Sequence, residues 1–371
     1  PEYSTLSNDA FRTKDFDFML SNPPYGKSWK SDLERMGGKD GIKDRRFLIE
    51  HAGDPEYSLI TRSSDGQMLF LANMLSKMKQ DTRLGSRIAE VHNGSSLFTG
   101  DAGQGESNIR RWIIENDWLE AIVALPLNMF YNTGIATYIW VLTNRKPQHR
   151  RGRVQLIDAT QWYKPLRKNL GKKNCELSEE DIRRICDTFT AFEETEQSKI
   201  FPNAAFGYWK VTVECPLRLK GIDPTRAYSP KEIKALKADQ QPDEAASLVI
   251  RKIHKKGAVP DSIHGLFETT INGKPAVVEY EPDTDLRDTE QIPLLEEGGI
   301  EAFIRREVLP YAPDAWFIED SVKTGYEISF TRYFYKPKPM RTLDEIRADI
   351  LALEKETEGL LDEILGTDGG H

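Results

Sequence analysis

Hydrophobic positions recur at regular spacing through the first 145 residues. Residues 16–20 alternate apolar and polar side chains, which is typical of a short strand. Residues 67–79, and the segment that begins at Ser107 with Ile109, Trp112 and Ile113, place apolar side chains at the spacing of a helical face. Three more strands are predicted from short apolar runs: residues 87–91, 119–125 and 137–143.

The order of these elements is strand, helix, strand, helix, strand, loop, strand. Alternation of this kind predicts an α/β fold with a mostly parallel sheet covered by helices. The last two strands are joined by PLNMFYNTGIA, residues 126–136, which is too short for a helical crossover. We therefore expect them to be antiparallel neighbours at one edge of the sheet.

Beyond residue 173 the pattern changes to a mixture of helices and strands. Ser178 predicts a helix start, because Asp181 completes a capping box. Ser229-Pro230 predicts a second helix, 244–256 a third, and the aromatic segment 326–335 a strand. After Lys-Pro-Lys-Pro, residues 341–365 predict a helix whose apolar positions step by three and four: Leu343, Ile346, Ile350, Leu353, Thr357, Leu360 and Ile364.

Composition narrows the class of protein. With 39% hydrophobic and 30% charged residues, the chain has the make-up of a globular protein, and it has neither a membrane-span-length apolar run nor a secretory leader. Cys175, Cys186 and Cys215 are too widely spaced for a disulfide framework or a metal site, and the histidines show no ligand spacing. We expect no metal and a reducing cytoplasm.

Charge is unevenly distributed. The net charge of −8 argues against a protein that holds nucleic acid over its whole surface. Residues 145–173, however, contain ten Lys and Arg side chains and one acid, Asp158. Such a stretch is either a local nucleic-acid contact or a solvated surface loop, and its composition leaves both open.

The candidate chemistry lies at the end of the first strand, where Asn22-Pro23-Pro24-Tyr25 follows an apolar run. Ligands of open α/β sheets bind beyond the carboxyl ends of strands. The Asn22 side chain offers an amide oxygen, and the Pro-Pro backbone presents carbonyls without N–H donors. Tyr25 adds a flat aromatic face. Two acceptors beside a ring suit a planar substrate that carries an amino group.

The chemistry of such an amine follows from its electronic structure. The lone pair of an exocyclic amine is delocalised into the ring, which makes the nitrogen a poor nucleophile. Acceptors on both N–H groups favour tetrahedral nitrogen, so that the amine can attack an electrophilic methyl group.

The segment FDFMLSNPPYG resembles motif IV of amino-methyltransferases that use S-adenosylmethionine. Residues 94–144, with the LPLNMFYNTG block, and the segment GYEISFTRYFY before the C-terminal helix are similar to one family, the modification (methyltransferase) subunit of type I restriction-modification systems. The resemblance implies a class I, Rossmann-like sheet with a mixed α+β extension, and a site-specific DNA methyltransferase that acts on the N6 amine of a flipped adenine. It also implies a prokaryotic cytoplasmic enzyme.

The family implies roles for matching residues. Asn22 and Pro23 would hold the amine beside the cofactor, with Pro24 stiffening the turn, and Tyr25 would stack on the adenine. Phe130, next to Tyr131, would close the other face of the base, although a phenylalanine is often simply core. DNA, the specificity subunit and the restriction subunit are the implied partners. The specificity subunit would bind helix 341–365, although the helix could instead fold back on its own domain. From the charge of residues 145–173, and not from the resemblance, we predict that Arg150, Arg151 and Arg153 contact the DNA backbone.

The chain departs from the family pattern before Asn22, where no glycine-rich cofactor loop occurs. Gly100, Gly103 and Gly105 do not have GxGxxG spacing, and we expect an ordinary loop there. The sequence therefore predicts an N-terminally truncated fragment that is inactive alone. Its expected domains are residues 1–173 (partial methyltransferase domain), 174–335 (accessory α+β region) and 336–371 (C-terminal helix and tail). The alternatives are an assembly-only fragment that binds the specificity subunit, and a methyltransferase acting on protein glutamine or RNA.

Overall fold

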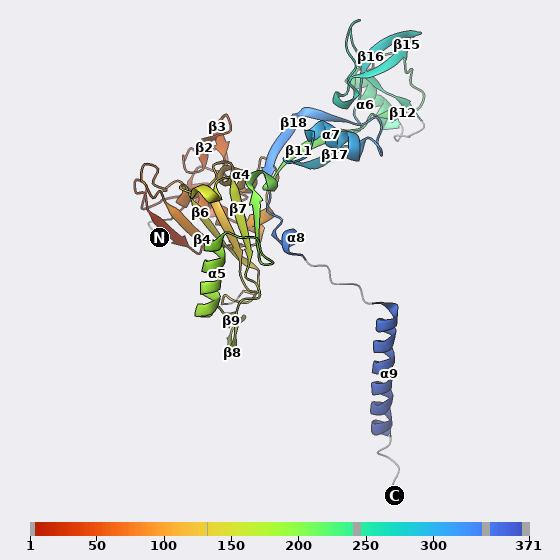
Figure 1. The fold of residues 1–371 in the computed structure, drawn as a ribbon. Coiled ribbons are helices and arrows are strands. Elements are labelled where there is room, and N and C mark those ends of the chain that lie inside the picture. Colours follow the sequence, from red (N-terminus) through yellow and green to blue (C-terminus); the bar gives the residue numbers. More distant parts are fainter. Residues whose placement is uncertain (1–3, 132, 240–245, 336–341, 366–371) are drawn as a thin grey trace. The chain divides into compact units, whose positions relative to one another are not determined.

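The computed structural model describes residues 4–131, 133–239, 246–335 and 342–365 (Figure 1). Contacts divide the chain into two units, Pro1–Phe330 and Thr331–His371, and each is described by itself. Within the described residues, no helix is both long and apolar enough to cross a membrane.

The first unit contains a six-stranded sheet in the order β1-β4-β6-β5-β7-β10. Its strands are β1 (Phe18–Ser21), β4 (Arg87–Asn93), β5 (Leu119–Ala124), β6 (Thr137–Thr143), β7 (Arg153–Asp158) and β10 (Ser198–Pro202). Strand β1 runs parallel to β4, and β5 runs parallel to β7. The pairs β4–β6, β6–β5 and β7–β10 are antiparallel.

The α/β fold class is confirmed, with two corrections. The sheet is mixed, whereas the sequence predicted a mostly parallel one. Strands β5 and β6 are antiparallel neighbours as predicted, but they lie in the middle of the sheet and not at its edge, because β4 pairs with β6 and β7 pairs with β5. Strand β10 also lies beyond residue 173, so the sheet draws on the region that we expected to be accessory.

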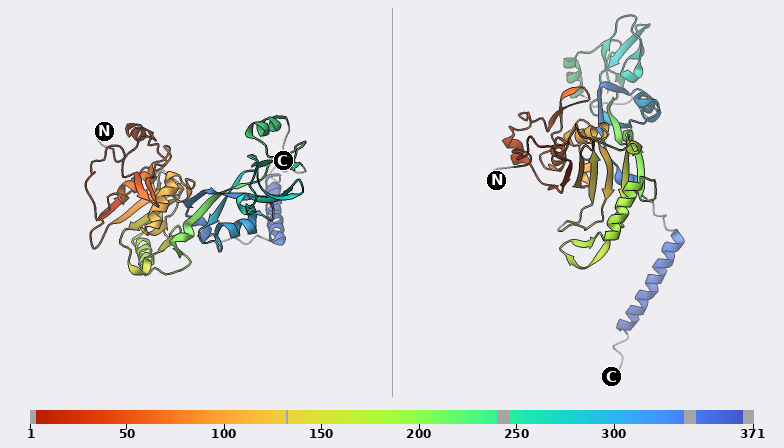
Figure 2. Two further views of the ribbon diagram at one scale, coloured as in Figure 1. Left: turned by 90° about the horizontal axis from the view of Figure 1, so that it is seen from above. Right: turned by 60° about the vertical axis from the view of Figure 1, so that its left-hand side comes forward.

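In the centre of the sheet, both faces of β5 are buried. On one face, Val123 and Ile157 pack with Ile185 and Phe189 of α5 (Glu179–Ala191), which lies along the sheet in Figures 1 and 2. On the other face Ile122 and Trp140 are fully buried. Helix α2 (Gln67–Leu75) contacts β4 and α4 (Gly105–Glu115). The capping box predicted at Ser178 is present at the start of α5.

The remaining elements of the first part of the chain are short. They are α1 (Lys30–Arg35), the hairpin of β2 (Leu48–His51) and β3 (Asp54–Ser58), α3 (Ser95–Phe98), and the hairpin of β8 (Lys164–Leu170) and β9 (Lys173–Glu176).

Residues 207–330 form three small sheets with their own apolar clusters. One sheet is β17-β11-β18 (Asp288–Pro293, Gly207–Glu214 and Trp316–Tyr326), which packs with α7 (Gly299–Phe303). The others are β14-β16-β15 (Ile250–Ile253, Lys274–Tyr280 and Phe267–Ile271) and β12-β13 (Arg218–Leu219 and Ser247–Leu248). Helix α6 (Pro230–Asp239) begins where Ser229-Pro230 predicted it.

Two predictions in this region were wrong. Residues 244–256 were expected to be helical, but the described part forms β13 and β14, because β-branched Val249 and Ile250 are buried beside the partner strand β16. The aromatic segment 326–335 was expected to be a strand. It leaves β18 at Tyr326 and forms the short helix α8 (Phe330–Phe334).

The second unit contains α9 (Leu343–Leu365), which agrees with the predicted helix 341–365 to within two residues at its start. The side chains of Leu343, Ile346 and Ile350 are exposed. The preceding Lys-Pro-Lys-Pro and the last six residues lie outside the described ranges. The division into three domains stays a prediction.

Candidate active site

One edge of the sheet collects the segments that the sequence singled out. The register pairs Ser21 of β1 with Glu90 of β4, and Ala124 of β5 with both Tyr138 of β6 and Asp158 of β7. The carboxyl ends of β1, β4, β5 and β7 therefore lie at the same edge. Asn22–Tyr25 leaves this edge after β1, and the loop 125–136 leaves it after β5. This is the edge at which ligands of open α/β sheets bind.

The Asn22–Tyr25 segment has free acceptors. The Asn22 side chain is exposed, and neither it nor the Pro23 carbonyl is hydrogen-bonded to any residue that the structure describes. The Pro23 ring is buried, which fixes the turn, and Tyr25 is half-buried. A phenol with its ordinary pKa of about 10 is neutral at pH 7, and burial raises the pKa of Tyr25 further. The segment can accept two N–H bonds beside a neutral ring.

The chain after the motif is firmly held. Trp29 is buried, its indole Nε1 donates to the Arg62 carbonyl at 2.9 Å, and its backbone N–H donates to the Ser63 carbonyl at 3.0 Å. A side chain at Gly66 would meet the Trp29 ring at 3.1 Å. Sequence reasoning missed this anchor, although a tryptophan four residues after the motif was the available signal.

The loop 125–136 delivers Phe130 to a packed cluster. Phe130 and Met129 are partly buried against Val123, Ile157 and Trp162. No ring contact joins Phe130 to Tyr25 in the part of the chain that the structure describes. Because β4 and β6 separate β1 from β5, the two exits are about 14 Å apart at ~4.8 Å per strand. The two predicted base-stacking residues share an edge but are not in contact.

The three predicted DNA-contact arginines differ in exposure. Arg150 is buried, with its guanidinium carbon 4.0 Å from the Phe189 ring centre and 4.3 Å from that of Phe192. It donates hydrogen bonds to the Phe189 carbonyl and to Gln155 Oε1. In this conformation Arg150 cannot reach a phosphate, and it stabilises the packing of α5 instead. Arg151 and Arg153 are exposed, so their role stays a prediction.

A buried polar cluster lies behind the same edge and was not predicted. Glu90 and His92 are fully buried neighbours on one face of β4, with Glu90 Oε2 and His92 Nε2 2.9 Å apart. Glu90 Oε1, His92 Nδ1 and Trp140 Nε1 lack partners among the described residues. The available sequence signal for this cluster was two ionisable residues, Glu90 and His92, at alternate positions of an otherwise apolar strand. The three atoms are of the kind that internal water satisfies.

The glycines at 100–105 have a structural explanation. They connect α3 to α4 and do not follow a strand, as a phosphate-binding loop does. A side chain at Gly105 would lie 2.0 Å from the Ile60 carbonyl oxygen, so close packing requires glycine there. A cleft of about 580 Å³ next to this loop is lined by Leu33, Thr61, Arg62, Gly105 and Glu106. Within the described ranges, no cluster of His, Cys, Asp and Glu of metal-binding type occurs.

Comparison with known proteins places the chain in a family. A family model described as N-6 DNA Methylase matches residues 2–206, which is more than half of the chain. The chain belongs to the N-6 DNA methylase family. The family assignment confirms the resemblance that rested on Asn22–Tyr25 and the LPLNMFYNTG block.

The chain matches individual relatives only in part. It is 29% identical over 189 residues to the type I restriction enzyme MjaIX methylase subunit of Methanocaldococcus jannaschii, covering 51% of this chain and 30% of that protein. It is 28% identical over 179 residues to the MpnII methylase subunit of Mycoplasma pneumoniae, covering 48% and 28%. The chain thus spans less than a third of the length of these relatives.

A solved structure is also similar. The methyltransferase subunit of a type I restriction-modification system from Streptococcus thermophilus aligns with a TM-score of 0.43 and 24% identity, covering 55% of this chain and 38% of that one.

Proposed function

We propose that this chain carries the base-binding side of a DNA adenine-N6 methyltransferase, the modification subunit of a type I restriction-modification system. The observation that carries the proposal is the position of Asn22–Tyr25. In a chain of the N-6 DNA methylase family, a neutral phenol and two acceptors without partners among the described residues lie together at the carboxyl edge of the sheet. An adenine presents the amine and the flat ring that this arrangement fits.

The proposed chemistry is nucleophilic attack by the adenine N6. The Asn22 amide oxygen and the Pro23 carbonyl each accept one N–H of the amine, which localises the nitrogen lone pair. The nitrogen forms a bond to the incoming methyl carbon as the bond from that carbon to its leaving group breaks. One N–H proton is then lost to solvent, and no general base is needed. Tyr25 holds the base plane by stacking, which is worth roughly 1–3 kcal/mol per base.

The methyl donor in this proposal is S-adenosylmethionine, which supplies an electrophilic methyl group when bound. The described residues fit the amine side of the reaction only. Residues 4–21 contain no glycine, so no glycine-rich turn precedes β1 within them, and the loop at 100–105 does not follow a strand. Asn22 and Pro23 are the residues next to which the methyl group would have to arrive.

Two consequences follow for activity and assembly. We propose that residues 1–371 do not transfer methyl groups alone, because no glycine-rich loop that fits the cofactor occurs among the described residues. We also propose that α9 binds the specificity subunit, since Leu343, Ile346 and Ile350 form an exposed row on a helix. The restriction subunit would join the same complex in a prokaryotic cytoplasm.

The test of the function is the identity of the methylated product. A full-length subunit that contains this chain would be expressed with its specificity subunit, and the host DNA digested to nucleosides for mass spectrometry. We expect N6-methyladenine that maps to one sequence, and none with Asn22→Ala. Methylation on cytosine, on RNA or on protein glutamine instead would refute the proposal. Titration of S-adenosylmethionine into residues 1–371 by calorimetry should give no binding heat.

A further inference from the structure

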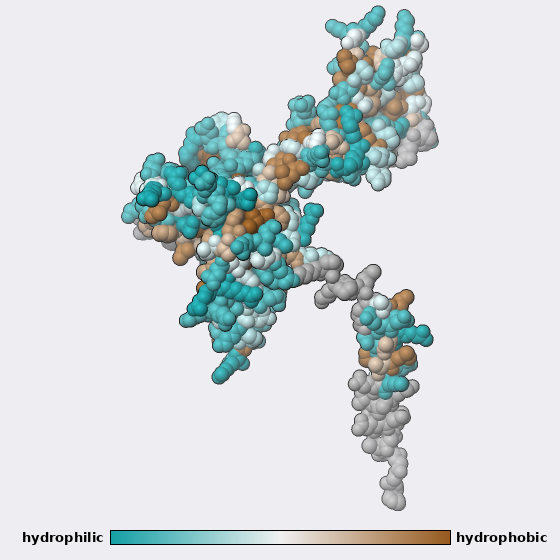
Figure 3. All heavy atoms as spheres, in the orientation of Figure 1, coloured by the Kyte–Doolittle hydropathy of each residue, from teal (hydrophilic) through white to brown (hydrophobic). Residues whose placement is uncertain are grey.

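The β8–β9 hairpin is a two-stranded ribbon that contributes little to the core. Its strands pair only with each other, and nearly all residues of β8 are exposed. It carries five basic side chains and one acid, Glu176: Lys164, Arg167, Lys168, Lys172 and Lys173. The side chains of Arg167, Lys168 and Lys172 make no hydrogen bond or ion pair within the described residues. Figure 1 shows the hairpin projecting from the sheet, and its surface in Figure 3 is mostly hydrophilic.

The hairpin belongs to the edge that carries Asn22–Tyr25. It follows β7, whose last residue, Asp158, pairs with Ala124 at the end of β5. Its base is fixed to the loop after β5, because the Cys175 thiol donates to the Leu127 carbonyl at 3.2 Å and the Asn174 N–H donates to the Asn128 carbonyl at 3.1 Å. The base of the hairpin is therefore attached to the loop that holds Phe130.

The tip combines charge with an apolar side chain. Leu170 is 53% exposed and lies directly before the turn glycine, Gly171, which has φ of +63°. Basic residues flank it on both strands. Leu170 is one of several exposed large apolar side chains among the described residues, and its place at the tip between cations suits a ribbon that enters a groove, where phosphates lie on either side and base edges at the bottom.

We propose that the β8–β9 hairpin is the DNA-docking arm of this protein: its cations contact phosphates on both sides of the major groove, and Leu170 lies against the base edges beside the target. The major groove accepts a two-stranded ribbon. The proposal rests on the proposed function for its choice of DNA. The proposal narrows the predicted DNA contact from the whole basic stretch 145–173 to the hairpin. Docking of the hairpin would also fix the position of the Asn22 edge of the sheet on the duplex.

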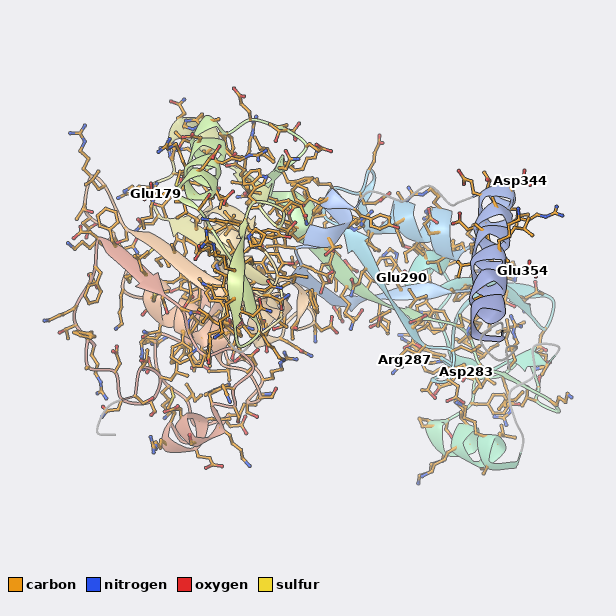
Figure 4. The ribbon with its side chains drawn as sticks, turned by 90° about the horizontal axis from the view of Figure 1, so that it is seen from below. Glu179, Asp283, Arg287, Glu290, Asp344 and Glu354 are labelled. Carbon is orange, nitrogen blue, oxygen red and sulfur yellow. The ribbon has the colours of Figure 1, made fainter. Side chains whose placement is uncertain are left out.

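Residues 207–330 differ from the basic hairpin in their charge. They contain 16 Lys and Arg against 22 Asp and Glu, and their acids include Asp283 and Glu290, seen with Arg287 in Figure 4. Arg287 is paired, since its Nη2 lies 2.6 Å from Glu214 Oε1. The net negative charge of this region disfavours phosphates, so the hairpin is a better candidate for DNA contact than residues 207–330.

The first measurement is the salt dependence of binding to a fluorescein-labelled, random-sequence DNA duplex, followed by anisotropy with this chain. Each phosphate contact contributes about 0.9 to the slope of log K against log salt. Arg167→Ala/Lys168→Ala should reduce the slope by about 2. The matched control, Lys255→Ala/Lys256→Ala, removes another exposed basic pair and should leave it unchanged. No duplex binding at low salt, or equal slopes in both variants, would overturn the proposal.

The second measurement tests whether the tip of the hairpin enters the DNA groove. Leu170→Cys and, as control, the 76%-exposed Val259→Cys are labelled with an environment-sensitive fluorophore in a Cys186→Ser/Cys215→Ala background. Duplex DNA should shift the emission of the label at 170 to the blue and leave the label at 259 unchanged. Double-stranded RNA, whose deep and narrow major groove excludes a ribbon, should compete weakly. An unshifted label at 170, an equal shift at 259, or equal competition by RNA would contradict groove insertion.

These measurements need no methyl donor, which separates the two proposals. If the hairpin variants alter the slope but the full-length subunit produces no N6-methyladenine, the proposed function fails and the DNA-docking arm stands. If N6-methyladenine forms while the slope is insensitive to the hairpin, the arm fails and the function stands.

Discussion

Strands β1 and β5 are alike in sequence character and different in surroundings. Both are apolar, and both end at the same edge of the sheet. All six residues of β5 are buried between β6 and β7. Strand β1 pairs with β4 alone among the described residues, and its Phe18 and Leu20 are 72% and 83% exposed.

This difference leads us to expect that β5 contributes mainly to folding stability and the exit of β1 mainly to catalysis. After β5, the chain returns Phe130 to a packed cluster, whereas after β1 it presents Asn22 to solvent with its amide unpaired among the described residues. Substitutions around β5 should therefore cost folding free energy, and substitutions at the exit of β1 should cost catalysis. Exposed apolar side chains on an edge strand are also a surface that proteins ordinarily cover.

The largest expected effect is on turnover by Asn22→Ala in the full-length enzyme. Removing one acceptor that acts mainly in the transition state should lower kcat by about 10²–10³, as for loss of one oxyanion-hole donor, with little change in DNA affinity or melting temperature. Ser21→Ala, one residue earlier, is the control. Single-turnover methylation measures kcat, and equal losses in binding and turnover would assign Asn22 a structural role.

The next effect is on stability and compares the two strands directly. Ile122→Ala in β5 removes a fully buried side chain and should cost about 2–5 kcal/mol of unfolding free energy. Leu20→Ala in β1 should cost less than about 0.5 kcal/mol in this chain. Urea unfolding followed by circular dichroism gives both values. Similar costs at the two positions would show that β1 contributes as much to folding stability as β5 does.

Phe130→Ala tests a residue that packs in the apolar cluster next to β5 and is also predicted to stack on the target base. If Phe130 closes the base pocket, a 2-aminopurine at the target should brighten on flipping and stay bright in the variant, because stacking worth roughly 1–3 kcal/mol is lost. Met129→Ala, partly buried in the same cluster, should still allow quenching. Unchanged fluorescence and turnover in Phe130→Ala would assign it to the core alone.

The smallest expected effect is a pH dependence beside β1. Burial opposes ionisation of Asp9, but hydrogen bonds from Lys77 and the Phe11 N–H, with Arg46 nearby, outweigh it and hold the pKa of Asp9 below its ordinary 3.8. An acid with a depressed folded pKa contributes stability above its unfolded pKa and loses it as pH falls through the folded value. Unfolding free energy should therefore decline below about pH 4. Asp9→Asn should flatten that decline, and an identical pH profile would show that the pair contributes nothing.

The elements that could be predicted from the sequence are those fixed by local pattern. Strands 87–93, 119–124 and 137–143 follow from short apolar runs, and Ser178 from its capping box. The position of β5 and β6 within the sheet could not be predicted, because it depends on pairing with β7, further along the chain. Residues 247–253 were mistaken for a helix since their strand partner is some 30 residues away.

Some features of the candidate site could be predicted from the local sequence, and others could not. The motif and its edge followed from the strand that precedes Asn22. The burial of Arg150 did not, because it depends on Phe189 of α5, which packs back on β7, and on Phe192 just after the helix. The anchor at Trp29 likewise depends on the Arg62 and Ser63 carbonyls, which no local pattern indicates.

The proposed function requires the target base to lie at the exit of β1. Once the methylated sequence is mapped, a duplex with 5-iodouracil in place of the target adenine can be cross-linked by light to the assembled enzyme. The cross-linked peptide is then identified by mass spectrometry. We expect a cross-link to Tyr25 that Tyr25→Ala abolishes while DNA binding persists. A cross-link confined to peptides from residues 207–330 would contradict it.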